Sequence, residues 1–248
     1  MADPHELTRM TYWWPLVADL DVPMPRTRII TIDSELSRAW FVNMADGRPG
    51  IYAVPPWDAD LRAAAEDIGY PCFLRTDLTS AKHAWGRTCY VSGTRELTGH
   101  VYALLEFHFN ALGLPWPQAL VVREYLSPCP GFLAFGGLPI GRERRYFVRD
   151  NSVECHHPYW PENAIRGASS VAWKTLLADA NRETPTEVEL LTGYAQAIGE
   201  RLGGYWSVDF FCSAEPRWYF IDAAVGKLSW HPACEVARID DDAVSPEG

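Results

Sequence analysis

The run Tyr205-Trp206-Ser207-Val208-Asp209-Phe210-Phe211-Cys212 is followed, after a four-residue break, by Arg217-Trp218-Tyr219-Phe220-Ile221-Asp222. Both runs are dense in aromatic and β-branched residues, and the break contains a proline, so together they predict a β-hairpin. Each run carries one acid. A four-residue loop would place Cys212 opposite Arg217 and Asp209 opposite Phe220, with Asp222 one diagonal step away on the same face.

The length of this loop decides whether the two acids can act together. A change of one residue would put Asp209 and Asp222 on opposite faces, because side chains alternate along a strand. On one face, about 6 Å apart at an effective dielectric near 20, the carboxylates would repel each other by roughly 2 to 3 kcal/mol. A bound cation would relieve that repulsion, or one acid would stay protonated. The alternative is two acids at strand ends, each solvated separately.

The composition excludes some classes of partner. At 248 residues the chain is long enough for one large domain or two small ones. Acidic residues outnumber basic ones by 32 to 22, and the formal net charge of -10 argues against a surface that binds phosphate backbones nonspecifically. We therefore expect no nucleic-acid partner.

The cysteines and the apolar runs bear on location. Six cysteines occur without a Cys-x-x-Cys pair, and the chain begins Met-Ala-Asp-Pro-His-Glu without a basic and apolar signal segment. This pattern is typical of reduced thiols, so we expect a cytoplasmic protein. We expect no membrane span, because the best apolar run, around Tyr102 to Leu114, is interrupted by Glu106, His108 and Asn110.

Helix and strand signals alternate along the rest of the chain. Thr94 is a candidate N-cap for a helix with an apolar face from Leu97 to Leu105. The near-continuous apolar run from Ala119 to Leu126 predicts a strand buried on both faces. Glu143 to Arg149 alternates as a strand, and Thr184-Pro185-Thr186-Glu187 has the form of a capping box.

The charged residues follow an order, with basic groups first and the paired acids last. Taken singly, each basic residue would be a surface or ion-pair residue. Together they are what a nucleoside triphosphate with a divalent metal would need, because arginine and lysine neutralise phosphate oxygens and carboxylates hold magnesium. The set comprises a strand with Arg75, a loop with Lys82, a strand ending Arg123-Glu124-Tyr125-Leu126, a strand with Glu143 and Arg145, and the hairpin with Asp209 and Asp222.

At these residues the chain resembles the ATP-grasp superfamily, and within it the proteins related to the cell-division-cycle chaperone that assembles a eukaryotic translation initiation factor. The order and spacing of the motifs from about residue 70 to 232 carry the resemblance, together with the hairpin. The other segments are Arg75-Thr76-Asp77-Leu78-Thr79-Ser80-Ala81-Lys82, Arg123-Glu124-Tyr125-Leu126 and Glu143-Arg144-Arg145-Tyr146-Phe147-Val148-Arg149-Asp150-Asn151.

The resemblance implies an α+β fold, the ATP-grasp fold, in which two lobes bind ATP between antiparallel sheets. Asp209 and Asp222 would bind Mg2+, and Arg145, Lys82 and Lys227 would be catalytic. The residues that would contact the nucleotide are Arg75 and Lys82 at the phosphates, Arg145 near the γ-phosphate, Glu124 with the Tyr125-Leu126 backbone at the adenosine, and Arg123 and Glu143 beside them.

One departure from the family pattern concerns the metal. In the family the second metal acid is normally followed two residues later by Asn, and here that position is Ala224. A neutral oxygen ligand is therefore missing. Lys227 could supply positive charge instead, or could simply be exposed. Glu124, in turn, could be a buried partner of Arg123 or Arg145 rather than a nucleotide ligand.

The resemblance also implies a division of the chain and a function. We expect a lead-in subdomain at 1–67, a first lobe with a hinge strand at 68–126, a second lobe at 127–235 and an acidic tail at 236–248. The function would be an ATP-dependent ligase that activates a carboxylate as an acyl phosphate for capture by an amine or thiol. Substrate contacts would come from loops near 132–135, 156–160 and 230–231. The alternative is a nucleotide-dependent assembly factor with a protein partner and little turnover.

Overall fold

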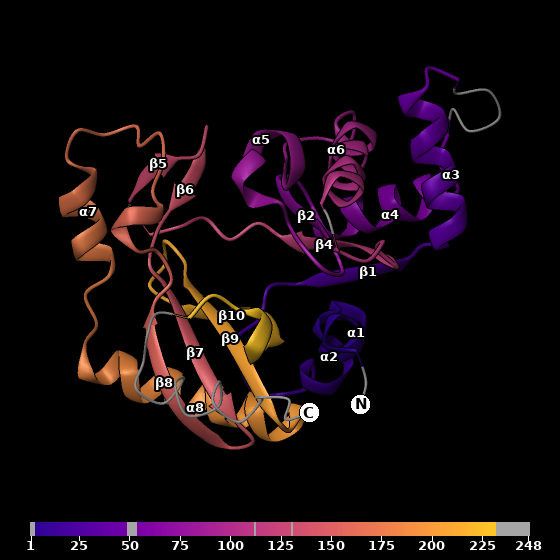
Figure 1. The fold of residues 1–248 in the computed structure, drawn as a ribbon. Coiled ribbons are helices and arrows are strands. Elements are labelled where there is room, and N and C mark those ends of the chain that lie inside the picture. Colours follow the sequence, from indigo (N-terminus) through magenta and orange to yellow (C-terminus); the bar gives the residue numbers. More distant parts are fainter. Residues whose placement is uncertain (1–2, 49–53, 112, 130, 232–248) are drawn as a thin grey trace, which may run out of the picture.

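The computed structural model describes residues 3–48, 54–111, 113–129 and 131–231 of the chain. The expected acidic tail, 236–248, lies outside these residues. The described chain forms two lobes, each built on a four-stranded antiparallel sheet with helices packed against it (Figure 1). The predicted α+β class is therefore confirmed. No helix within these ranges is both long enough and apolar enough to cross a membrane.

The first lobe has the strand order β1-β4-β2-β3. Its central strand β4 (Ala119–Glu124) is buried on both faces, as its continuous apolar run predicts, and ends two residues earlier than expected. The other elements are β1 (Thr27–Thr31), β2 (Cys72–Thr76), β3 (Tyr90–Val91), α3 (Ser34–Ala45), α4 (Asp58–Ile68), η2 (Lys82–Ala84), α5 (Trp85–Thr88) and α6 (Leu97–Asn110).

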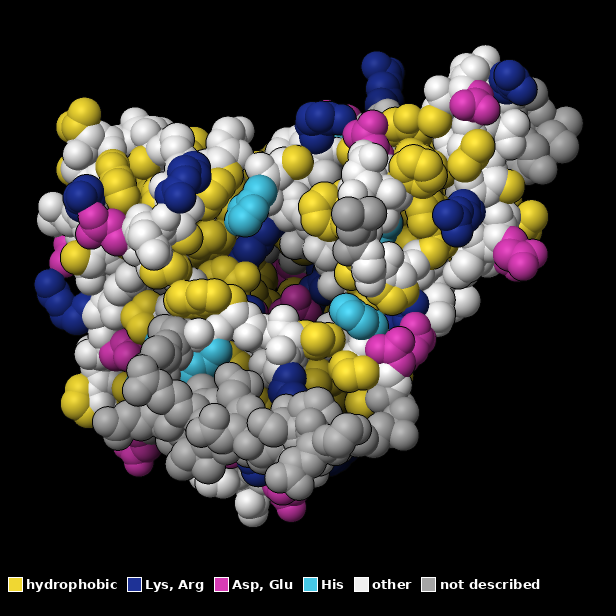
Figure 2. All heavy atoms as spheres, in the orientation of Figure 1, with side chains coloured by type: hydrophobic (Ala, Val, Ile, Leu, Met, Phe, Trp, Pro, Cys, Tyr) yellow, Lys and Arg dark blue, Asp and Glu magenta, His cyan; other side chains and the backbone are white. Residues whose placement is uncertain are grey.

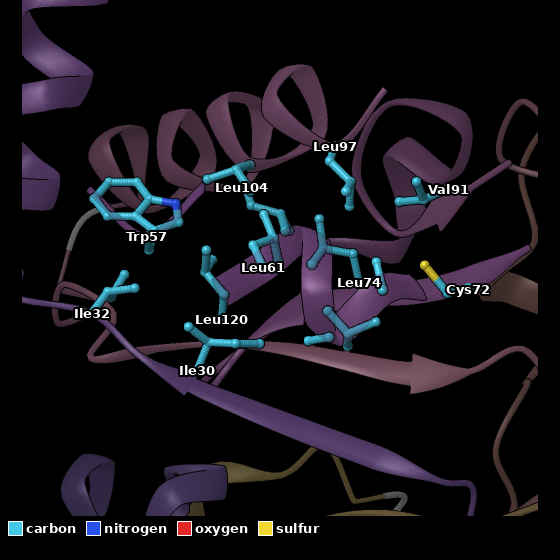
Figure 3. Packing of buried hydrophobic residues seen from close by; sticks show 14 of the residues in the cluster. Ile30, Ile32, Trp57, Leu61, Cys72, Leu74, Val91, Leu97, Leu104 and Leu120 are labelled. Atoms are coloured by element: carbon cyan, nitrogen blue, oxygen red, sulfur yellow. The ribbon is translucent and has the colours of Figure 1, made fainter. Parts of the chain in front are cut away.

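The core of the first lobe lies between this sheet and the helices. Side chains of one buried cluster, among them Leu61 of α4 and Leu104 of α6, point from the helices onto Leu74 and Leu120 of the sheet (Figure 3). The expected lead-in, 1–67, contributes α3 and α4 to this cluster. Its division from the first lobe remains a prediction.

The N-cap prediction for α6 is wrong. The helix begins at Leu97 with Glu96 as its N-cap, and no side chain caps it. The Thr94 hydroxyl and carbonyl instead accept hydrogen bonds from the Arg62 guanidinium of α4, at 3.2 and 3.1 Å. The Thr94 hydroxyl, which the local sequence would assign to the N-cap of α6, is therefore bonded to an arginine of another helix.

The second lobe has the strand order β10-β9-β7-β8. Helix α8 packs on one face, and the N-terminal helices complete the same core, with α1 against β10 and α2 against α8. Its elements are β7 (Glu143–Arg149), β8 (Ser152–Pro158), α8 (Pro185–Leu202), β9 (Tyr205–Cys212), β10 (Trp218–Val225), η4 (Gly226–Leu228), α1 (Pro4–Thr8) and α2 (Met10–Val17).

Half of the predicted capping box is present at the start of α8. The Thr184 hydroxyl accepts a hydrogen bond from the backbone N–H of Glu187 at 3.2 Å. The Glu187 carboxylate does not return to the cap. It pairs with the buried guanidinium of Arg144 at 2.9 Å and with the partly exposed Arg142, and the need of buried Arg144 for a carboxylate partner explains why Glu187 leaves the cap.

A smaller layer connects the two lobes along the chain. The hairpin of β5 (Phe132–Ala134) and β6 (Leu138–Ile140) packs with α7 (Trp173–Ala180) around a third buried cluster, near the short helix η3 (Glu162–Ala164). In Figure 1, β5 and β6 lie next to α5 of the first lobe, and α7 lies on their other side.

The β9–β10 hairpin exists, but its predicted register is wrong. Cys212 pairs with Trp218 rather than with Arg217, so the loop has one residue more than expected. That shift alone would place Ile221 opposite Asp209. A β-bulge between Phe220 and Asp222 adds a second shift of one residue, and Asp222 becomes the direct partner of Asp209. The two shifts add: the first alone would turn Asp222 to the opposite face, and the second returns it to the face of Asp209, so the acids are closer neighbours in register than predicted.

Candidate functional site

A cavity of about 590 Å³ lies between the lobes and takes its walls from both. Figure 2 shows the molecule hollowed there, with apolar side chains at the rim and basic and acidic side chains in its depth. Most of the predicted site residues come together in its lining: Arg75, Lys82, Arg123, Glu124, Tyr125, Leu126, Glu143, Asp209 and Asp222.

Two predicted residues lie elsewhere. Arg145 does not line the cavity but stands behind Asp209, and its guanidinium lies 4.7 Å from the ring centroid of Tyr159, which does line it. Lys227 lies in η4, exposed and outside the lining. Of the two interpretations of Lys227, exposure is the one that its position favours.

The alternation of β7 directs its charged residues to two sides of the sheet. Glu143 and Arg145 face the cavity side, while Arg144 points to α8, where its fully buried guanidinium pairs with Glu183 and Glu187. These two neighbouring arginines therefore have different contacts. Arg144 binds the segment between α7 and α8 to the sheet, and Arg145 contacts Asp209 on the cavity side.

A row of charged side chains crosses three strands of the second sheet. Arg145 of β7 is the register partner of Asp209 of β9, which is the partner of Asp222 of β10. Arg145 donates from Nε and Nη2 to the two carboxylate oxygens of Asp209, each at 2.7 Å. This bidentate pair is the strong form of an arginine–carboxylate contact.

Two further ion pairs cross from one lobe to the other. Arg75 of β2 forms an ion pair with Asp222 of β10 at 2.9 Å, and Lys82 of η2 lies 3.3 Å from the carboxylate of Glu143. The ammonium of Lys82 also lies 4.0 Å from the ring centroid of Tyr159 and 4.6 Å from that of Trp160. In the free protein, the candidate phosphate-binding groups therefore hold carboxylates across the cavity.

The pKa shifts of these cations follow from that pairing. Burial acts to lower the pKa of Lys82, but Glu143, Tyr159 and Asp209 together outweigh it and the net pKa is raised. Burial likewise acts to lower the pKa of Arg145, and Asp209, with smaller contributions from Tyr159 and Asp222, raises it overall. Both side chains therefore remain positively charged throughout the physiological pH range.

Glu124 ends β4 at the mouth of the cavity. Its carboxylate accepts the backbone N–H of Arg26 at 3.2 Å and lies 3.7 Å from the Arg26 guanidinium. The interpretation of Glu124 as a buried partner of Arg123 or Arg145 is therefore wrong. Since β4 ends here, Glu124 is partly exposed and points toward the lead-in segment instead.

Sequence reasoning missed an aromatic wall beside the predicted adenosine contacts. Phe73 and Trp85 line the cavity with their ring centroids 6.0 Å apart, and Trp85 stacks on Tyr90 at 5.6 Å. Tyr125 meets Tyr90 edge to face at 5.2 Å. Such a wall suits a planar ring. The sequence signal that could have indicated this wall is Trp85, an aromatic residue only three positions after the predicted site residue Lys82.

The residues present fit one magnesium ion. Asp209 and Asp222 offer two hard oxygen donors side by side, and magnesium sites for nucleotides combine one or two carboxylates with phosphate oxygens and water. No group of three or more His, Cys, Asp or Glu side chains gathers for a metal within the described residues. Ala224, two residues after Asp222, brings no side-chain oxygen to this site.

Comparison with known proteins establishes the class of fold: the chain has the ATP-grasp fold, as predicted. Cdc123 from Schizosaccharomyces pombe, C-terminally truncated, superposes with a TM-score of 0.56 at 13% identity over 90% of this chain and 84% of that one. A second structure of Cdc123 from Schizosaccharomyces pombe superposes with a TM-score of 0.53 at 12% identity, again over 90% of this chain and 84% of that one. VanG D-Ala:D-Ser ligase from Enterococcus faecalis gives 0.50 at 12% identity over 88% of this chain and 52% of that one.

The sequence itself gives no such match. No protein-family model matches it, and a search of curated proteins finds no match either. At the identities of the solved structures the likeness concerns the fold alone, so the activity has to be argued from the site.

Proposed function

We propose that the chain binds Mg-ATP between its lobes and activates a substrate carboxylate, which an amine or thiol then captures. A carboxylate oxygen would attack the γ-phosphorus as the bond to the β-phosphate oxygen breaks and ADP leaves. The amine or thiol would then attack the acyl carbon, inorganic phosphate would leave, and the nucleophile's proton would pass to solvent. The observation that supports this most is the cavity, in which cations and carboxylates from both lobes meet.

The ion pairs of the free protein suggest how the nucleotide would be accommodated. Lys82 would exchange its carboxylate partner Glu143 for phosphate oxygens, and Arg75 would be released by Asp222. Asp209 and Asp222 would at the same time exchange arginine for magnesium, which when bound neutralises phosphate charge during transfer.

The other side chains of the cavity would position the nucleotide. The wall of Phe73 and Trp85 offers an apolar surface for the base, and the Tyr125-Leu126 backbone lies beside it in the lining. Arg145, which contacts Asp209 in the free protein, would stabilise the negative charge that develops during phosphoryl transfer once magnesium has taken that carboxylate.

A second function is favoured by one specific observation. Asp209 and Asp222 are each bonded to an arginine, and Ala224 offers no side-chain oxygen where a third ligand would help to separate them. A chain that binds ATP but turns it over slowly would act as a nucleotide-dependent assembly factor with a protein partner. The two functions share the same binding step and differ in catalysis.

Thermal unfolding with and without ATP and magnesium tests the binding step. We expect ATP to raise the melting temperature of the wild type, and more so with magnesium, because a ligand that binds only the native state stabilises it. Asp222→Asn should lose the magnesium-dependent part. Asp67→Asn is the matched control, since it removes an acid from an exposed ion pair with Arg28. If ATP shifts none of these proteins, nucleotide binding is refuted.

Turnover separates the two functions. ADP release should rise in the presence of particular mixtures of carboxylic acids and amines or thiols if the protein is a ligase. If ATP binds but no mixture stimulates ADP release, the ligase is refuted. ATP-dependent retention of one defined protein would then support the assembly factor.

A further inference from the structure

Arg123 is the unusual cation of the cavity. Its side chain is 3% exposed, Nε donates to the Thr27 hydroxyl at 3.1 Å, and Nη1 donates to the backbone carbonyl of Ile221. The ring of Trp14 covers the guanidinium, 5.4 Å from its centre. Nη2 has no hydrogen-bond partner among the described residues. A buried donor without an acceptor is costly, and it marks a place where an acceptor is expected.

The charge of Arg123 is also uncompensated. Lys82 pairs with Glu143, Arg145 with Asp209 and Arg75 with Asp222, whereas no described carboxylate lies within 4 Å of the Arg123 guanidinium. Burial, with the nearby charge of Arg75, lowers the pKa of Arg123 to about 9, and Asp222 opposes this shift only in part. Asp222 therefore pairs with Arg75 and offsets the positive charge of Arg123 only in part.

The sheet register explains why the two arginines are neighbours. Arg123 of β4 is the partner of Phe73 of β2, and Arg75 follows Phe73 by two residues, so both arginines point from one face of the first sheet. Val121, which shares this face, packs into the core of the second lobe. The arginine pair thus looks across the cavity toward β10 and Asp222.

We infer that the Arg75–Arg123 pair is the binding site for the carboxylate of the substrate, and that Asp222 blocks the Arg75 side of this site in the free protein. This inference rests on the proposed function, in which Asp222 turns from Arg75 to magnesium. That movement leaves both guanidinium groups without an acid. A substrate carboxylate would take the vacated position, beside the metal-binding acids and therefore beside the γ-phosphate that it attacks.

The chemistry of the position favours a carboxylate over a further phosphate. Asp222 is itself a carboxylate, so the site already accommodates a planar group with one negative charge. Two guanidinium groups can share the two oxygens of such a group. The binding order follows as well, because the pair is open only after Mg-ATP has engaged Asp222. The substrate class is a small molecule or chain end with a free carboxylate.

Acetate is a direct probe of this site. In Asp222→Ala the stand-in carboxylate is missing, and sodium acetate should raise the melting temperature saturably above sodium chloride of equal ionic strength, without ATP. In Asp222→Ala combined with Arg123→Met the apparent Kd for acetate should rise about tenfold or more, because a charged hydrogen bond is lost. Asp67→Ala, which opens an exposed ion pair instead, should show no acetate effect.

The wild type provides the second arm. Without nucleotide it should not respond to acetate, and with Mg-ATP it should. Arg123→Lys keeps the charge but cannot form the second bond, and it should lose this response; its shift with Mg-ATP, recorded in the same series, shows whether the nucleotide still binds. This variant also replaces the double variant if that protein does not fold.

Three results would overturn the inference. Acetate binding to Asp222→Ala that is unchanged by either Arg123 substitution would mean that Arg75 acts alone. Tighter binding of inorganic phosphate than of acetate to Asp222→Ala would make the pair a phosphate site. A wild type that binds Mg-ATP but never responds to acetate would show that Asp222 does not vacate the pair. Failure of the proposed function looks different, since Mg-ATP would then shift no variant while acetate still binds Asp222→Ala.

Discussion

Removing the acid of the buried bidentate pair Arg145–Asp209 should destabilise the protein far more than removing the acid of a bidentate pair on the surface. Both side chains are largely buried, with 12% and 9% of their area exposed, and the contact joins both carboxylate oxygens at 2.7 Å. Unit charges about 4 Å apart attract by about 4 kcal/mol at an effective dielectric near 20. Asp209→Asn removes this attraction and leaves the arginine buried without an acid, so we expect a loss of about 3 to 5 kcal/mol.

The chain offers a matched control of the same geometry on the surface. Arg201 contacts both oxygens of Asp19, at 2.9 and 3.2 Å, but the two side chains are 45% and 68% exposed. Water and salt screen such a pair, and its loss leaves no buried charge. Asp19→Asn should therefore cause no measurable change in stability.

Urea unfolding followed by circular dichroism measures both effects under one condition. Arg145→Met and the double variant with Asp209→Asn complete a cycle, in which the double variant should lose clearly less than the sum of the single losses, because the second change removes a charge already left alone. If Asp209→Asn costs no more than Asp19→Asn, or if the cycle is additive, burial does not strengthen this pair and our argument for it is refuted.

Two further predictions concern packing and pH. A Cβ on Gly199 of α8 would overlap the carbonyl of Asp150 and the side chain of Val148, so Gly199→Ala should cost about 1 to 3 kcal/mol, whereas Gly193→Ala on the same helix meets open space and should stabilise by about 0.5 to 1 kcal/mol in the same urea assay. Burial lowers the pKa of His108 to about 4, so the unfolded chain binds a proton that the native state refuses between about pH 6.5 and pH 4. The stability of the wild type should fall by about 3 kcal/mol as the pH drops through that window, and His108→Gln should lack this fall in urea titrations at several pH values; equal pH dependence in both proteins would contradict the assignment.

Local sequence predicted those elements whose pattern is complete within a short stretch. The apolar run of β4, the alternation of Glu143 to Arg149 and the aromatic hairpin all form as expected, because burial on one or both faces follows from the periodicity of neighbouring residues. The order of the charged residues also indicated the ATP-grasp fold before any geometry was known.

Predictions failed where a partner comes from a distant segment. The hydroxyl of Thr94 bonds to Arg62 instead of capping α6, and the carboxylate of Glu187 pairs with arginines of β7 instead of closing the capping box. In both cases the side chain bonds to an arginine of another element instead of capping its own helix, and sequence spacing does not reveal that arginine. The aromatic wall was missed for the same reason, since Phe73 and Trp85 meet only once the first lobe has folded.

The sequence by itself determined that two acids lie in one hairpin, with arginines and a lysine earlier in the chain, because residue type and strand periodicity are local properties. Only the tertiary structure decided what those groups do in the free protein. A loop residue and a bulge together made Asp209 and Asp222 direct partners. Strand pairing within the second sheet gave Asp209 its arginine, and the approach of the first sheet gave Asp222 another. Register and ion pairing depend on contacts between distant segments, and so does the unpaired edge of Arg123, which no spacing in the sequence could show.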